Sequence, residues 1–151
     1  MDGYHLTRVE NLVGEEGIAS KGLIPQCGVR STLVGDERVV VCFTDDYFYL
    51  PFWKEELYRF AFPEELRVLT FSINEKDCMK NYREFATKLA IPASKISIAS
   101  FWLSSIQEGI PFYRLAKYRD YPDYIEVRKT SLENYILEES KDKPYQFYKK
   151  R

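Results

Sequence analysis

The segment 38–44 has the sequence Arg-Val-Val-Val-Cys-Phe-Thr and is the most strongly strand-forming run of the chain. Branched and aromatic side chains favour strands, whereas Asp45 and Asp46, which end the run, do not. The same criteria predict strands at residues 3–7, 66–73, 95–103, 112–118 and 124–129. Because strands outnumber helices and the two do not alternate in a βαβ rhythm, we expect an α+β fold with a mainly antiparallel or mixed sheet.

Helices are predicted at four places along the chain. Thr7-Arg8-Val9-Glu10 and Thr130-Ser131-Leu132-Glu133 both have the T-x-x-E form of a capping box, so a helix should begin at each of them. A short helix is expected over residues 53–60. Asn74 should cap a further helix over 75–90, one face of which carries apolar side chains at helical spacing: Cys78, Tyr82, Phe85 and Leu89.

The length of 151 residues fits one domain over 1–151, since a chain of this size buries roughly 70% of its unfolded surface. Aromatic residues make up 16% of the chain, and a thick aromatic core explains them better than a stacking surface does. The net charge of −1 gives no global basic field for nucleic acid. Residues 141–151 are polar, aromatic and basic, which indicates a docked or flexible tail, or alternatively a strip that binds single strands.

The three cysteines, Cys27, Cys42 and Cys78, are widely spaced and form no CxxC pair. With His5 as the single histidine they make no convincing zinc site, so we expect reduced thiols and no metal. No apolar run approaches the roughly 20 residues that a bilayer span requires, and the start of the chain lacks the basic and apolar regions of a signal peptide. These features predict a cytoplasmic protein with no membrane contact.

Common catalytic motifs are absent from the sequence. There is no P-loop, no G-x-G-x-x-G after a strand, no G-x-S-x-G and no H-E-x-x-H. A Ser/His/Asp triad would have to use His5, and nothing near it supports one. A Cys/His pair of His5 with Cys27 or Cys42 stays open, without a local signature.

Several short motifs together resemble one known family. Tyr4-His5-Leu6-Thr7, then Val9-Glu10-Asn11-Leu12, then Gly22-Leu23-Ile24-Pro25 resemble the opening of ADP-ribosyltransferase-like proteins, nearest the DarT-type DNA ADP-ribosyltransferase toxins. Val40–Thr44 is similar to the next core strand of that family, and Glu126-Val127 followed by Leu132–Ile136 is similar to its closing strand and the segment after it. The resemblance covers residues 4–60 and 120–137, whereas residues 61–119 match nothing in it.

This resemblance implies a split, mainly antiparallel sheet core with flanking helices that holds NAD in a bent shape. His5 would bind the adenosine ribose, because a neutral imidazole offers one donor and one acceptor, and Thr7 would fix the same strand end. Glu126 would bind the nicotinamide ribose, stabilise the oxocarbenium-like centre as nicotinamide leaves, and act as a general base. Asp123, three residues away, is an alternative acid.

The resemblance also implies aromatic and basic groups around NAD. One of Phe43, Tyr47 and Tyr49 would stack on the nicotinamide ring. Arg30 or Arg38 would hold the pyrophosphate or steer the acceptor, since a guanidinium group suits phosphate oxygens. RNA 2′-phosphotransferases are a second branch with the same fold, but the complete basic set of that branch is not found here.

The function that follows from the resemblance is NAD-dependent ADP-ribosylation of a macromolecular acceptor, with a nucleic-acid base favoured over a protein acceptor. Two alternatives stay open: a non-catalytic domain of the same fold that binds a nucleotide or a partner, and an interaction protein without a ligand. Each residue also has a structural explanation. His5 fits an ordinary strand histidine, Thr7 a helix cap, Glu126 a solvent-facing residue, and the aromatic segment 47–53 a part of the core.

Overall fold

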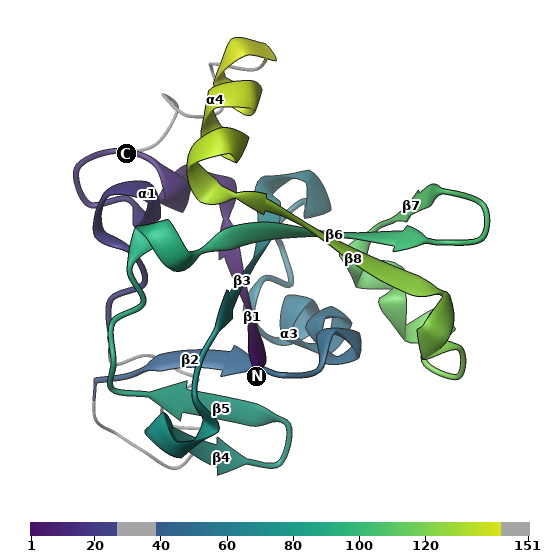
Figure 1. Ribbon diagram of the computed structural model, residues 1–151, viewed down its shortest axis with the longest axis horizontal. Helices are drawn as coiled ribbons and strands as arrows, with labels where there is room; N and C mark the ends of the chain where they lie inside the picture. Colours follow the sequence, from purple (N-terminus) through teal and green to yellow (C-terminus); the bar gives the residue numbers. More distant parts are fainter. Residues whose placement is uncertain (27–38, 143–151) are drawn as a thin grey trace.

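An antiparallel sheet of eight strands organises the chain in the computed structural model, which describes residues 1–26 and 39–142 (Figure 1). The strand order is β4-β5-β2-β1-β3-β6-β7, and β8 pairs with the opposite edge of β6. The strands are β1 (Asp2–Arg8), β2 (Val41–Thr44), β3 (Leu66–Ser72), β4 (Cys78–Asn81), β5 (Glu84–Thr87), β6 (Ser97–Leu103), β7 (Glu108–Ile110) and β8 (Ile125–Ser131). The predicted α+β class with a mainly antiparallel sheet is therefore confirmed.

The sheet is made of three well-paired groups that are joined at few positions. β1 and β3 pair along seven residues, whereas β1 meets β2 only where Tyr4 lies opposite Thr44. β3 meets β6 at two positions, Leu69 opposite Ile98 and Thr70 opposite Ser97. The groups β4-β5-β2 and β6-β7-β8 consequently diverge from the central pair, as Figure 1 shows.

Short helices connect the strands and cover the two faces of the sheet. The α-helices are α1 (Ile18–Lys21), α3 (Leu50–Leu57) and α4 (Leu132–Asp142). The 3₁₀ helices are η1 (Val9–Leu12), η2 (Tyr47–Tyr49), η3 (Pro63–Glu65), η4 (Glu75–Asp77), η5 (Ala93–Lys95), η6 (Phe112–Tyr118) and η7 (Pro122–Tyr124). None of the α-helices among the described residues exceeds eleven residues, so the sheet carries most of the structure.

Two apolar clusters hold the covering helices on the sheet, one on each face. The first is built around Phe43, Leu69 and Phe85 and includes residues of η1 and α4. The second is built around Leu6 and Phe101 and includes residues of α3 and η6. Because neighbouring residues of a strand point to opposite faces, β3 and β6 contribute to both clusters.

Most of the predicted strands are confirmed, with shifted ends. The strands predicted at 3–7, 66–73, 95–103 and 124–129 correspond to β1, β3, β6 and β8. The run 38–44 forms β2 only from Val41, and Val40 makes an isolated bridge with Gln26. The helix predicted at 53–60 exists as α3, which begins earlier, at Leu50.

The helix predicted over residues 75–90 is wrong. This segment forms η4 and the hairpin of β4 and β5, with Tyr82 at a φ of 62° in the turn. Leu89, expected on the buried face, is half exposed, and Tyr82 is 79% exposed. All four residues of β5 are buried because β5 lies between β4 and β2, and Phe85 stacks on Phe43. Pairing with β2 therefore overrides the helical spacing of the apolar residues.

The strand predicted over residues 112–118 is also wrong, because these residues form the 3₁₀ helix η6. Pro111 precedes η6, and Leu115 is its one fully buried side chain, packed in the cluster that includes α3. A segment that rests on a helix and does not pair with a strand edge gains nothing from an extended backbone.

The two capping predictions differ in outcome. η1 follows Arg8 without any side-chain cap, so Thr7 does not cap a helix and instead belongs to β1. α4 begins close to the predicted place, but its cap is Ser131, whose hydroxyl oxygen accepts a hydrogen bond from the Asn134 N–H at 3.2 Å. The tail predicted at 141–151 lies outside the described residues from 143 onward.

Candidate functional site

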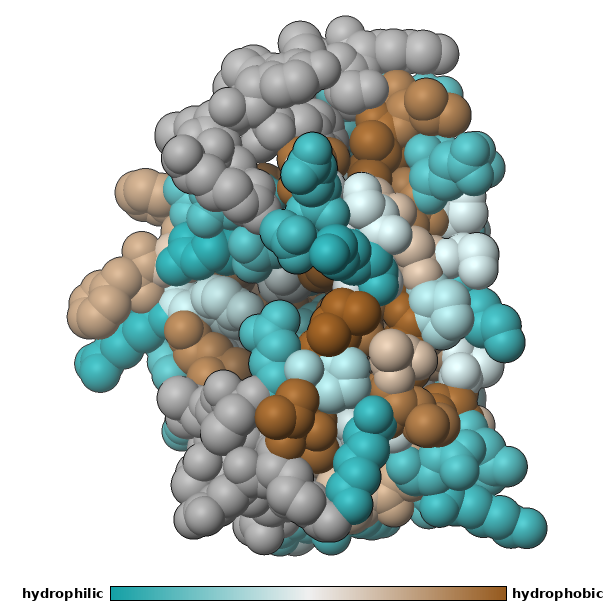
Figure 2. Space-filling model, turned by 90° about the vertical axis from the view of Figure 1, so that its left-hand side faces the viewer, coloured by the Kyte–Doolittle hydropathy of each residue, from teal (hydrophilic) through white to brown (hydrophobic). Residues whose placement is uncertain are grey.

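A hollow of about 410 Å³ lies where β1 and β2 diverge beyond their single paired position. This volume is in the range of small-molecule sites. Its walls come from β1, from β2, from the segment 11–26 and from α3 and Tyr58. Figure 2 shows the side of the molecule that carries α1 and β2, where apolar side chains reach the surface between hydrophilic ones.

His5 connects the two strands at the hollow through its side chain. Its Nδ1 lies 2.7 Å from the backbone oxygen of Cys42 in β2. A carbonyl oxygen only accepts hydrogen bonds, so Nδ1 carries the hydrogen and donates it. Burial lowers the pKa of His5, and the bond to Cys42 opposes this shift without cancelling it. The imidazole is therefore neutral near pH 7, and its Nε2 is a hydrogen-bond acceptor.

Two further polar side chains lie beside His5 in the hollow. Thr7 is buried on the same strand, and its hydroxyl oxygen accepts a hydrogen bond from Asn11 Nδ2 at 3.3 Å. The Thr7 hydroxyl keeps its own hydrogen to donate, and the Asn11 carboxamide oxygen is an acceptor. With His5 they form a corner of neutral donors and acceptors, which suits the hydroxyl groups of a sugar.

Another wall of the hollow is formed by α3 and the residue after it. Trp53 and Leu57 of α3 line it, and Tyr58 at the end of α3 donates its hydroxyl hydrogen to the Leu6 backbone oxygen at 3.3 Å. Among the described lining residues, Glu16 is the one Asp, Glu, Lys or Arg, and it pairs with Lys21 at 3.2 Å on the exposed rim. This exposed ion pair contributes little to stability.

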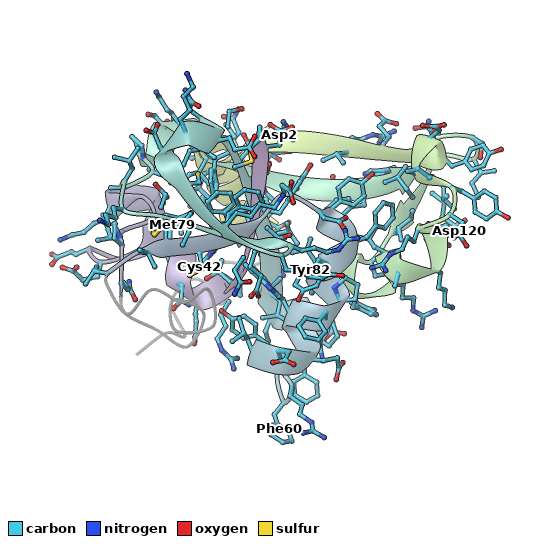
Figure 3. The ribbon with its side chains drawn as sticks, turned by 90° about the horizontal axis from the view of Figure 1, so that it is seen from below. Asp2, Cys42, Phe60, Met79, Tyr82 and Asp120 are labelled. Atoms are coloured by element: carbon cyan, nitrogen blue, oxygen red, sulfur yellow. The ribbon has the colours of Figure 1, made fainter. Side chains whose placement is uncertain are left out.

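The structure does not bring Glu126 together with His5. Glu126 lies on β8, opposite Trp102 of β6, and does not line the hollow. β3 and β6 separate β8 from β1 in the sheet. In Figure 3, Asp120, a few residues before β8, lies at the right-hand end of the molecule, whereas Cys42, which lines the hollow, lies in the left half. Asp123 belongs to η7 at that same end and does not line the hollow either.

The three aromatic candidates for stacking on nicotinamide also lie outside the hollow. Phe43 is fully buried and packs on Phe71 and Phe85, so the structure gives it a role in packing. Tyr47 packs against Tyr4 and Phe101 in the second cluster. Burial raises the pKa of Tyr47, and the nearby Asp46 raises it further. Tyr49 packs against Phe52 at a ring separation of 4.9 Å. None of the three is among the residues that line the hollow.

Both arginine candidates, Arg30 and Arg38, lie outside the described residues, as does Cys27. Cys42 lines the hollow, but the hydrogen bond of His5 goes to its backbone oxygen and not to its thiol. This geometry orients the imidazole toward the backbone of β2 and gives no support to a Cys/His pair.

Glu84 is a residue that the sequence analysis missed. It is the one buried Asp or Glu among the described residues, at 7% exposure, and it lies opposite Thr44 at the start of β5. Its Oε1 accepts a hydrogen bond of 2.7 Å from the indole N–H of Trp53, which lines the hollow. Buried carboxylates are rare and cluster at functional sites. The sequence carries no signal for Glu84, because the apolar spacing of residues 75–90 predicts a helix and not a buried strand.

The described residues contain no cluster of three or more His, Cys, Asp and Glu side chains that is arranged to hold a metal ion. Within the same residues, no helix has both the length and the apolar character needed to cross a bilayer.

No protein-family model, no curated protein and no solved structure matches the chain.

Proposed function

We propose that this domain binds NAD in the hollow around His5 and transfers ADP-ribose from it to a macromolecular acceptor, with a nucleic-acid base as the first acceptor to test. The observation that carries the proposal is the orientation of His5, whose Nε2 is available as an acceptor beside Thr7 and Asn11. A ribose diol needs such a set of neutral donors and acceptors. The resemblance of residues 4–25 to ADP-ribosyltransferase-like proteins selects NAD among ribose-bearing ligands.

The acid in this proposal is Glu84 and not Glu126. A carboxylate stabilises an oxocarbenium-like centre best where water is excluded, and Glu84 is buried and bonded to Trp53, which lines the hollow. Glu126 is 42% exposed and paired with Arg128 at 3.1 Å. Loss of nicotinamide would leave positive charge on the ribose. Glu84 does not itself line the hollow, so it would face that charge only after the Trp53 ring moves aside.

The fold proposed for this function is the split sheet of the ADP-ribosyltransferase-like family. Two observations support it: the single paired position between β1 and β2, and the hydrogen bond from the His5 ring to the Cys42 backbone oxygen of β2. A reducing, cytoplasmic setting is part of the proposal, since the three cysteines of the sequence are widely spaced and form no CxxC pair.

Replacing His5 by alanine should raise the dissociation constant for NAD about tenfold, the effect of losing one hydrogen bond of about 1.4 kcal/mol. Isothermal titration calorimetry with NAD measures this constant. Arg8→Ala is the matched control, because Arg8 belongs to the same strand but does not line the hollow. Equal affinities for the wild type and His5→Ala would contradict a role of His5 in binding, and no binding by the wild type would refute the proposed function.

Replacing Glu84 by glutamine should reduce nicotinamide release from NAD about 100-fold, since glutamine keeps an acceptor for Trp53 but carries no charge. Glu126→Gln should release nicotinamide at the wild-type rate. Nicotinamide is quantified by chromatography after incubation with NAD and single-stranded DNA. Loss of release in Glu126→Gln alone would restore the acid first expected from the sequence.

The second candidate function is a nucleotide-binding domain without catalysis. It is favoured by the hydrogen bond that engages Glu84 with Trp53. In that case NAD would raise the melting temperature of the wild type and of Glu84→Gln equally, and neither protein would release nicotinamide.

A further inference from the structure

β8 is the longest edge strand of the sheet in the described part of the chain. It pairs along its whole length with β6, from Ile125 opposite Leu103 to Ser131 opposite Ser97, and with no other described strand. The other terminal strands, β4 and β7, have four and three residues. Figure 1 shows β8 running from α4 toward the end that carries β7. A long open strand edge is a template for pairing with another chain.

Two charged side chains on this edge strand, Glu126 and Arg128, are held in place by contacts within the protein. Glu126 and Arg128 lie two residues apart on one face of β8 and form an ion pair of 3.1 Å. The guanidinium group of Arg128 lies 4.1 Å from the ring centroid of Trp102 and also donates to Gln107. Both charged side chains stay more than one third exposed. The two side chains are therefore already positioned in the single chain.

This charge pattern is complementary to itself in one register. If two copies of β8 pair antiparallel with Val127 opposite Val127, each Glu126 lies opposite Arg128 of the other copy. A register centred on Glu126 would place two carboxylates opposite each other, and one centred on Arg128 would oppose two guanidinium groups. Like charges directly opposite destabilise a sheet, and opposite charges stabilise it.

We propose that the protein forms a two-fold dimer in which β8 pairs with β8 of a second copy, centred on Val127. The two sheets become continuous across this axis, and the same surface of both copies forms the contact, as two-fold symmetry requires. Glu126 and Arg128 set the register, and the half-buried Val127 side chains meet on the other face. This is the role that the structure assigns to Glu126, away from the hollow.

A second copy of the chain suits this edge, because the Glu126 and Arg128 charges of one β8 are complementary to those of an antiparallel β8. A nucleic acid or an anionic membrane would need an excess of positive charge, whereas Glu126 offsets the charge of Arg128 on this edge strand. A foreign strand would need its own matching pair of charges at the same spacing.

Charge reversal tests the dimer. Arg128→Glu places four carboxylates around the axis and should raise the dimer dissociation constant about tenfold or more, as should Glu126→Arg through four guanidinium groups. The double variant Glu126→Arg with Arg128→Glu restores each opposite-charge pair and should return the constant to near the wild-type value. Sedimentation velocity over a concentration series measures it, with the monomer mass of 17.9 kDa as reference.

Lys129→Glu is the matched control. It changes the charge of the same strand by the same amount but faces the other side, where Lys129 pairs with Asp2 of its own chain at 3.3 Å and the proposed register places it opposite the uncharged Ile125. It should leave the dissociation constant unchanged, and thermal unfolding of every variant verifies that the fold is retained. A wild type that stays monomeric throughout the series overturns the proposal, and so does a dimer that Arg128→Glu does not weaken or that the double variant does not restore. NAD is not needed, so the outcome is independent of the proposed activity.

Discussion

Replacing Phe43 by alanine should lower the free energy of unfolding by about 3–5 kcal/mol, the cost of removing a large aromatic ring from a close-packed core. Phe43 is fully buried, stacks on Phe85 at 5.5 Å and packs edge-on against Phe71 at 5.2 Å. The ring also fills the space above Gly3, where even a Cβ atom would lie 2.7 Å from it. Urea denaturation followed by circular dichroism measures the change.

Phe60→Ala is the matched control for this prediction. Phe60 is 93% exposed and projects from the loop after α3 (Figure 3), so its removal should change the unfolding free energy by less than about 0.5 kcal/mol. If Phe43→Ala were as stable as the wild type but bound NAD weakly, Phe43 would be a ligand-stacking residue after all.

Replacing Gly22 by alanine should destabilise the fold by about 3 kcal/mol and weaken NAD binding at the same time. Gly22 ends α1 with a φ of 76°, and an added Cβ would lie 2.1 Å from the backbone oxygen of Ile91. That oxygen accepts the hydrogen bond of the Leu23 N–H, which closes this wall of the hollow. The wall would have to move, and calorimetry with NAD would register the loss of affinity.

Gly109→Ala tests whether the effect at Gly22 comes from position and not from the residue type. Gly109 lies in β7, and a Cβ there would meet nothing within 4 Å. Its replacement should be tolerated with both stability and NAD affinity near wild-type values. A Gly22→Ala protein that melts at the wild-type temperature would show that the segment around Ile91 yields easily.

The strands were predictable where their own residues favour extended backbone. Val41–Thr44 and Leu66–Ser72 are rich in branched and aromatic side chains, and both are strands in the structure. The hairpin of β4 and β5 was not predictable, because Phe85 is buried by Phe43 of β2, a neighbour 42 positions earlier in the chain. The local spacing of the apolar residues in 75–90 predicts a helix, but the pairing of β5 with β2 makes this segment a strand.

The candidate site divides in the same way. His5 was recognised because it is the single histidine within an early strand motif, and the structure places it at a hollow. Glu126 was chosen by similar local evidence, yet two strands separate its strand from that of His5. Glu84 carried no local evidence, since its burial and its bond to Trp53 depend on how β5 and α3 approach each other.

The amino-acid sequence by itself determined the class of fold and the position of most strands, because β-branched and aromatic side chains bias the backbone locally. It also singled out His5. The tertiary structure alone decided which side chains share a cavity and which carboxylate is buried. Those properties depend on distances between residues far apart in the chain, and such distances follow from strand order, register and packing, which no local pattern encodes.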